Sequence, residues 1–315
     1  MKTIGKEFRN AVPFAIPFLV VPLIWLGAAM GGWWLVLAPI YGWYMLPFAD
    51  WIMGKDDDNP DLDVPKEDLF WYAMVTWVWP PLQVLAIFTT VWYATHTNHL
   101  SFGEKIALFT GVGVISGSIG INFSHELMHQ SSRMERWFAD ILLSTVLYSH
   151  FRSEHLLVHH VHVATPKDAV TAPYNTGFWR HFGYVLPNSL RSALEAEKAM
   201  LERKGLDAWD RSNPFYRYVI LQFSALLLAG YLGGAMGLFL FFWQALIAVF
   251  QLELINYIEH YGLVREQYED GKYEPVKPRH SWNATQRMSN LYLINLQRHS
   301  DHHASPSRPF PLLQT

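Results

Sequence analysis

The sequence contains no cysteine and carries few charges. Its 315 residues include no Cys, and only 16% of them are Asp, Glu, Lys or Arg. The absence of cysteine excludes disulfides, cysteine–zinc sites and iron–sulfur centres, so any redox metal must be bound by histidine and carboxylate ligands. The formal net charge of −3 lacks the basic excess of nucleic-acid-binding proteins, and we expect no nucleic-acid partner.

The hydrophobic residues make up 51% of the chain and fall in long blocks. A block of about 20 apolar residues is long enough to cross a bilayer as a helix. We therefore predict an all-α integral membrane protein, a single domain over 1–315, with six transmembrane helices. The predicted spans are 11–30, 33–53, 70–93, 103–123, 215–232 and 237–257.

The positions of the basic residues predict the orientation of these spans. Of the 24 Lys and Arg residues, 22 lie in the loops assigned to one side, 1–10, 54–69, 125–214 and 259–315. None lies in the loops assigned to the other side, 31–32, 94–102 and 233–236. Because cytoplasmic loops are enriched in Lys and Arg, both termini and the two long polar parts are predicted to face the cytoplasm.

Nine histidines recur at metal-ligand spacing in the polar parts. His299, His302 and His303 stand at i, i+3 and i+4, a spacing that puts all three on one helix face. The full set is His125, His129, His155, His159, His160, His260, His299, His302 and His303. Nine imidazoles exceed what one metal can use, so they predict a His-rich di-metal site with four or five ligands for each metal. We interpret the other six as ordinary polar residues: His96, His99, His150, His162, His181 and His280.

Two competing motifs explain less of this pattern. The segment from His125 to His129 reads His-Glu-x-x-His, the zinc-protease signature, but that signature leaves most of the other histidines unexplained. A carboxylate-bridged di-iron bundle needs Glu-x-x-His from two helices, and here it occurs once, at Glu126. Imidazole ligands alone suit iron, copper, nickel or zinc. The membrane context favours iron, because an apolar chain offers only unactivated C–H bonds and zinc is redox-silent.

The order of the histidine motifs resembles that of a known family. The motifs are His-Glu-Leu-x-His, Glu-His-x-x-x-His-His, Asn-Tyr-x-Glu-His-Tyr-Gly-Leu and Leu-Gln-Arg-His-Ser-Asp-His-His. They resemble those of the integral-membrane alkane 1-monooxygenases, within the membrane fatty acid desaturase and hydroxylase superfamily. The resemblance implies two non-haem iron ions held by the nine histidines. It also implies O2-dependent hydroxylation of medium- or long-chain alkanes to 1-alkanols, electrons from rubredoxin and rubredoxin reductase, and a place in a bacterial inner membrane.

Two alternatives stay open at this point. The first is a hydroxylase or desaturase of another apolar chain, a fatty acyl group or an alkylbenzene. The second is a His-rich membrane metal transporter. A transporter is expected to place its ligands near the middle of the bilayer within broken helices, whereas these motifs flank the predicted spans at one face.

Further residues are predicted around the histidines. Carboxylates next to metal-binding histidines commonly accept the second imidazole N–H, and we predict that role for Glu126, Glu154, Glu259 and Asp301. A channel for an apolar substrate should run between the helices, and we expect Gly42, Trp43 and Tyr44 to line it and limit chain length. A basic face for an acidic electron donor is expected from Arg133, Arg136, Arg152, Arg287, Arg298 and Arg308.

Overall fold

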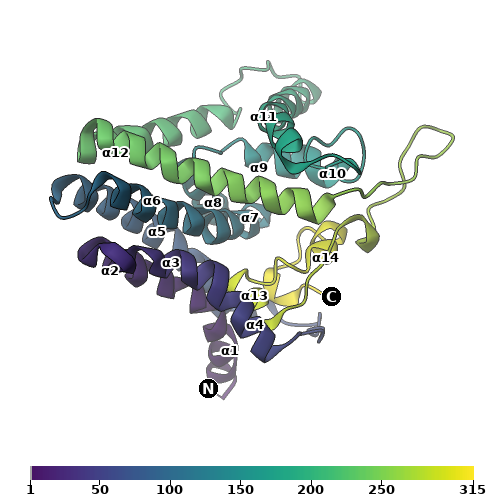
Figure 1. Ribbon diagram of the computed structural model, residues 1–315. Helices are drawn as coiled ribbons and strands as arrows, with labels where there is room; N and C mark the ends of the chain where they lie inside the picture. The colour runs from purple at the N-terminus through teal and green to yellow at the C-terminus, as the bar shows by residue number, and fades with distance from the viewer. Residues whose placement is uncertain (1) are drawn as a thin grey trace.

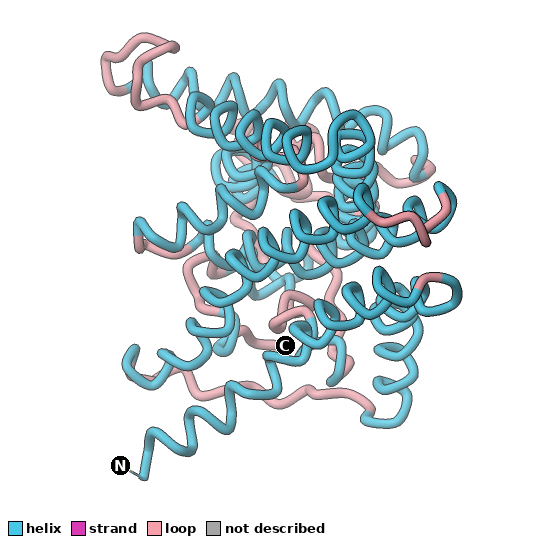
Figure 2. The backbone as a smooth tube through the Cα atoms, turned by 90° about the vertical axis from the view of Figure 1, so that its left-hand side faces the viewer, coloured by secondary structure: helices cyan, strands magenta, loops and turns pink. Residues whose placement is uncertain are grey.

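The computed structural model describes residues 2–315, and these residues are helical with connecting loops. They form no β-strand, as Figure 2 shows, and their only β-type pairings are two isolated bridges, Lys55 with Gln286 and Gln267 with Tyr273. The all-α prediction is confirmed.

The first third of the chain is a series of short helical pieces followed by one long helix. The elements are α1 (Lys2–Ala11), η1 (Val12–Leu19), α2 (Val20–Met30), η2 (Gly32–Val36), α3 (Leu37–Ile40), η3 (Tyr41–Met45), α4 (Leu46–Met53), η4 (Lys66–Leu69) and α5 (Phe70–His96). Pro17 lies inside η1 and lacks a backbone N–H, which explains why this stretch is a tighter 3-10 helix.

The middle of the chain carries the first two histidine motifs. Its elements are α6 (Phe102–Ile115), η5 (Ser116–Ile121), α7 (Asn122–His129), α8 (Arg133–Thr145), α9 (Phe151–Glu154), η6 (His155–His159), α10 (His160–His162) and α11 (Phe178–Arg203). A capping box starts α6, because Ser101 and Glu104 satisfy each other's backbone N–H groups. Both η5 and η6 are π-helical, a rare conformation that concentrates at functional sites.

The last third begins with the long helix α12 (Phe215–His260) and ends in short elements. These are η7 (Pro278–His280), α13 (Arg287–Tyr292), α14 (His299–Ala304) and η8 (Phe310–Leu312). Gly234 interrupts α12 with φ 58° and ψ −148°, a conformation that favours glycine. The two arms of α12 fold back on each other at this point. Their backbones come so close that a Cβ on Gly237 would lie 2.5 Å from the carbonyl oxygen of Ala229.

Four helices are long and apolar enough to cross a membrane: Gly5–Met30, Lys66–His96, Phe102–His129 and Phe215–His260. Five of the six predicted spans fall on these helices, since α12 contains two of them. The remaining predicted span, 33–53, falls on the successive helical pieces η2 to α4. The membrane character is therefore supported, and the count of six spans stays a prediction.

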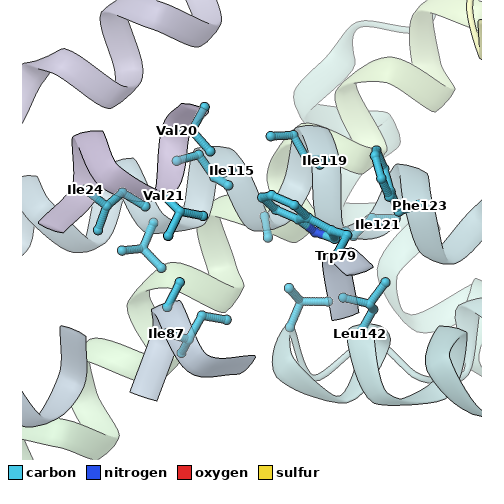
Figure 3. Packing of buried hydrophobic residues seen from close by; sticks show 14 of the residues in the cluster. Val20, Val21, Ile24, Trp79, Ile87, Ile115, Ile119, Ile121, Phe123 and Leu142 are labelled. Atoms are coloured by element: carbon cyan, nitrogen blue, oxygen red, sulfur yellow. The ribbon is translucent and has the colours of Figure 1, made fainter. Parts of the chain in front are cut away.

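Close packing of α6 and η5 against α12 depends on glycine. A Cβ at Gly113 would lie 2.6 Å from the carbonyl oxygen of Gln244, and one at Gly117 would lie 2.7 Å from the Gln251 amide nitrogen. Such small residues allow membrane helices to approach closely. On the other side of this layer, the buried Trp79 packs near Phe123 and the isoleucines of η5 (Figure 3).

The turn after α2, the turn between α5 and α6 and the turn within α12 lie at one end of the helix layers, and the elements that carry the histidines lie at the other (Figure 1). At one end the predicted outside turns meet: the backbone N–H of Gly32 donates to Glu104 Oε1 at 2.8 Å, and Gly233 packs against Thr95. At the other end lie α7, α10, α14 and the last turn of α12. Arg152 and Arg217 both donate to the buried Asp140, at 2.7 and 2.6 Å, so the start of the second histidine motif is tied to α8 and α12.

Candidate metal centre and cavity

The nine predicted histidines come together at one end of the molecule. His125 and His129 lie on α7, His260 ends α12, and the rest come from η6, α10 and α14. They form two groups, in each of which one nitrogen per residue lies within 4.8 Å of the others. One group has five members, His125, His129, His155, His160 and His302, and the other has four, His159, His260, His299 and His303. We call them the five-histidine group and the four-histidine group.

The second and the fourth histidine motifs each contribute to both groups. In the π-helical η6, Nε2 of His155 lies 2.9 Å from Nε2 of His160, five residues later, while His159 belongs to the other group. In α14, Nε2 of His299 lies 3.0 Å from Nε2 of His303, and His302 turns to the five-histidine group. The sequence places the three α14 histidines on one helix face. In the structure they do not all belong to one group, because His302 joins the five-histidine group while His299 and His303 join the four-histidine group.

The nitrogen atoms face one another in a way that hydrogen bonding alone does not satisfy. Nε2 of His155 lies 3.1 Å from Nε2 of His129 as well as 2.9 Å from that of His160. A neutral imidazole nitrogen either donates or accepts one hydrogen bond, so several nitrogens aimed at one point leave lone pairs without a partner. Nitrogens bound to one ion at about 2.1 Å lie within roughly 4.2 Å of one another. The nitrogens of each group, all within 4.8 Å of one another, come close to this spacing, so the residues are compatible with a metal site.

Burial keeps these imidazoles neutral. The pKa values of His155, His160, His299, His302 and His303 all lie well below the ordinary value, first because burial penalises the charged form and then because neighbouring imidazoles repel a second charge. A neutral imidazole is the form that binds a metal. The site is thus ready to bind cations at physiological pH without first losing protons.

Asp168 orients a histidine of the four-histidine group. Its Oδ2 lies 2.9 Å from Nδ1 of His159 and also accepts from the hydroxyl of Thr171. Burial acts to raise the pKa of Asp168, but His159 and Thr171 outweigh it and hold that pKa below its ordinary value. The ionised carboxylate fixes the proton of His159 on Nδ1, which leaves Nε2 for a metal. Sequence analysis missed Asp168, because it lies in an irregular loop with no motif around it.

The four predicted carboxylates have different surroundings. Glu259 Oε2 lies 3.4 Å from Nε2 of His299. Glu126 accepts from the Gln130 amide at 2.8 Å, and Asp301 forms an ion pair with Arg308; the hydrogen bonds of residues 2–315 give neither carboxylate an imidazole partner. Glu154 is fully buried, and burial raises its pKa well above the ordinary value. Its oxygens have no hydrogen-bond partner within the described residues.

An apolar cavity of about 530 Å³ reaches both histidine groups. Its wall includes His125 and His155 of the five-histidine group and His299 of the four-histidine group. Gly42 and Trp43 also line it, as expected of a substrate channel, whereas Tyr44 is not among the lining residues and is 70% exposed. The remaining lining is mostly aliphatic and aromatic, from η5, the second arm of α12 and the 282–297 segment. Such a cavity can bind a molecule without polar groups.

Comparisons with known proteins agree with this geometry. The family model described as "Fatty acid desaturase" matches residues 100–315. The alkane 1-monooxygenase 2 of Pseudomonas aeruginosa is 35% identical over 288 residues, which cover 89% of this chain and 75% of that protein. The alkane 1-monooxygenases of Pseudomonas putida and Ectopseudomonas oleovorans are each 36% identical, over 94% and 99% of this chain and 76% and 73% of their own lengths. The chain therefore belongs to the fatty acid desaturase family and, within it, to the alkane 1-monooxygenases.

Proposed function

We propose that this protein hydroxylates the terminal carbon of a medium- or long-chain alkane, with consumption of O2, two electrons and two protons. The observation that carries the proposal is the apolar cavity whose wall contains ligands of both histidine groups. A methyl group at the end of an alkane in this cavity would lie beside the metal centre. The alkane 1-monooxygenase relatives make the chain an oxidoreductase and support this reaction.

The proposed metals are two non-haem iron ions, one in each histidine group. Nine neutral imidazoles suit several transition metals, but activation of O2 requires a metal that changes oxidation state, which zinc does not. Iron bound there would supply the electrons and the Lewis acidity that O2 activation needs. The protein's own part is to hold nine imidazoles in place, with Asp168 orienting His159 through its Nδ1. Glu259 instead approaches Nε2 of His299, the nitrogen that faces the other imidazoles of its group.

The substrate is held by burial alone. An alkane has no polar group to bind, so its affinity comes from apolar contact, at roughly 0.8 kcal/mol per CH2 group. Gly42 and Trp43 stand at the part of the cavity lined by Ser118 and Tyr292, and a Cβ on Gly42 would be 3.6 Å from the Tyr292 hydroxyl. We therefore restrict the proposed chain-length limit to Gly42 and Trp43 and use Tyr44 as a control.

We propose six spans in a bacterial inner membrane, with both termini and the metal centre on the cytoplasmic side. The distribution of Lys and Arg supports this orientation, because almost all of them lie in loops on the same side as the histidines. The proposed electron donors, rubredoxin and its reductase, would then reach the centre from the cytoplasm.

Fewer arginines are proposed to contact the electron donor than the six expected from the sequence. Three of the six expected arginines have partners within the protein: Arg152 pairs with Asp140, Arg308 with Asp301, and the buried Arg298 donates to the carbonyl oxygen of Leu313. Arg136 bonds the backbone of Gln130 and Ser131. Arg133 and Arg287 are exposed, and we propose these two as contacts for an acidic donor.

The decisive experiment combines metal analysis with product identification. Purified protein in detergent or nanodiscs should contain two irons per chain and should convert alkanes to 1-alkanols when rubredoxin, its reductase, NAD(P)H and O2 are supplied. Gas chromatography of the products, with fatty acids and alkylbenzenes as competing substrates, distinguishes the remaining alternatives. A single stoichiometric zinc with peptidase activity, or metal transport without any hydroxylated product, would overturn the proposal.

A further inference from the structure

A chain of buried polar side chains runs from the edge of the molecule toward the cavity wall. Tyr148 and His150 lie in the turn between α8 and α9, Ser189 lies on α11 and Glu253 lies on α12. Tyr148, Ser189 and Glu253 are 6%, 2% and 1% exposed, and His150 is half-buried. We call these four side chains the polar relay.

The distances within the relay connect it end to end. Nε2 of His150 lies 3.4 Å from the hydroxyl of Ser189, and the hydroxyl of Ser189 lies 3.1 Å from that of Tyr148. Tyr148 donates to Glu253 Oε1 at 2.8 Å. Because Tyr148 uses its proton on Glu253, its oxygen is left to accept. The Ser189 hydroxyl can donate to this oxygen at 3.1 Å or to the carbonyl oxygen of Leu186 at 3.2 Å. When Ser189 donates to Tyr148 and accepts from His150, all donors point the same way, from His150 to Glu253.

The two ends of the relay lie in different surroundings. The outer end is His150, the one member that is not fully buried. At the inner end, Glu253 Oε2 accepts from the Asn256 amide at 3.3 Å, and Asn256 lines the cavity together with His125, His155 and Glu259. The relay therefore joins partly exposed protein to the wall of the cavity that holds the metal ligands.

His150 and Tyr148 both stay uncharged, as a relay requires. Burial lowers the pKa of His150 to about 4, so its imidazole is neutral and has one donor and one acceptor nitrogen. Burial and the nearby Glu253 raise the pKa of Tyr148 well above its ordinary value, so its phenol keeps its proton. Neutral groups that both donate and accept can pass a proton along by shifting each bond in turn.

We propose that the polar relay is the proton entry path of this enzyme. The inference rests on the proposed function, in which RH + O2 + 2 electrons + 2 H⁺ gives ROH + H2O, with the electrons supplied by rubredoxin. Each turnover therefore consumes two protons in a cavity lined mainly by apolar side chains. In the proposed step, water gives a proton to the free nitrogen of His150, one proton moves across each hydrogen bond, and the Glu253 carboxylate takes up the last one. The resulting carboxylic acid then gives its proton to water in the cavity beside Asn256, which restores the carboxylate.

The chain contains a matched control for this path. Tyr218 on α12 is also buried, and its hydroxyl lies 3.0 Å from that of Ser153, which donates to Glu197 at 2.5 Å. This is a second tyrosine–serine–glutamate arrangement of similar burial. Unlike Glu253, which bonds the cavity-lining Asn256, Glu197 has no hydrogen-bond partner for its Oε2 within the described residues, so this arrangement does not lead to the cavity wall. Loss of the Tyr218 hydroxyl should therefore disturb packing as much as loss of the Tyr148 hydroxyl, without blocking proton entry.

The first test measures proton access without turnover. The iron-loaded enzyme is transferred into D2O in the absence of alkane and reductant, and infrared spectroscopy follows the carboxylic C=O band that Glu253→Gln removes. Tyr148→Phe should slow exchange of this band at least tenfold, while Tyr218→Phe should exchange as fast as the wild type. Equal exchange in all three proteins would overturn the proposal, as would the absence of any Glu253 band between pH 5 and 8.

The second test measures turnover. Tyr148→Phe and Ser189→Ala should lower kcat by roughly 100-fold. They should also show a larger solvent isotope effect, more peroxide released per NAD(P)H, and an unchanged KM for the alkane. Ser189→Thr, which restores a hydroxyl, should recover most of the rate, and Tyr218→Phe should stay within about twofold of the wild type. If wild-type protein makes no 1-alkanol, the proposed function fails and the exchange result still decides the relay. If the wild type is active and Tyr148→Phe keeps its rate and isotope effect, only the relay fails.

Discussion

The two histidine groups differ in ligand number, exposure and support. All members of the four-histidine group are buried, and carboxylates lie beside two of them, Asp168 at His159 and Glu259 at His299. The five-histidine group has one more ligand, but His129 and His160 are partly exposed, and no hydrogen bond of the described residues joins its imidazoles to a carboxylate. Burial and neighbouring carboxylates support the four-histidine group, whereas the five-histidine group has a fifth imidazole instead. From this difference we predict that the two proposed metals differ in how easily they are lost.

Removal of one ligand from each group gives the largest expected effect. His303→Ala leaves three imidazoles in the buried group, whereas His129→Ala leaves four in the other. We expect both variants to lose alkane turnover, since each metal is needed. Iron analysis should separate them: His303→Ala should fall to about one iron per chain, and His129→Ala should keep a larger share of its second iron. Equal iron contents would remove the distinction between the groups.

Loss of the orienting carboxylate should have the next largest effect. Asp168→Asn removes the charge that holds the proton of His159 on Nδ1, and such changes typically cost 10- to 100-fold in metal affinity or activity. Glu259→Gln should cost less, because Glu259 approaches the group-facing Nε2 of His299, at 3.4 Å, and does not hold a proton on Nδ1. Iron titration monitored by absorbance measures both. Glu126→Gln is the control, since Glu126 bonds Gln130 instead of an imidazole, and an effect as large as that of Asp168→Asn would contradict the assignment.

Exposure predicts the order in which the metals leave. A chelator added to the loaded protein should remove iron in two phases, with the faster phase from the five-histidine group, whose His129 and His160 are partly exposed. The rates should differ several-fold. In Asp168→Asn the slow phase should accelerate while the fast phase stays unchanged. A single phase in the wild type, or acceleration of the fast phase alone, would show that burial does not govern metal release.

Substitutions at Gly42, Trp43 and Tyr44 should have the smallest effect on metal content. Those at Gly42 and Trp43 should instead change the preferred chain length of the alkane. Gly42→Trp should shorten the preferred alkane, because the added side chain meets Tyr292 and Val114. Trp43→Ser should lengthen it. Tyr44→Ser should keep the parent profile, because Tyr44 is exposed and does not line the cavity. Gas chromatography across a series of alkanes measures the profile, and iron content should stay at the wild-type value in all three.

Much of the local structure was predictable from the sequence. Five of the six apolar blocks of spanning length correspond to the long helices. The turn predicted at 233–234 lies where α12 folds back, because Gly234 adopts a backbone conformation with positive φ. These features depend on composition and on single-residue preferences, so a reader of the sequence can find them.

The nine histidines were identified from the sequence, and their division into groups was not. Ligand spacing shows that a segment can bind a metal, but it assumes a regular α-helix. The π-helical turn at η6 and the two directions used by α14 assign neighbouring histidines to different groups, and both depend on how the segments pack. Asp168 and the polar relay were missed for the same reason. Their partners lie far apart in the sequence or in irregular loops, and only the tertiary structure brings a carboxylate to His159 or a serine of α11 to Tyr148.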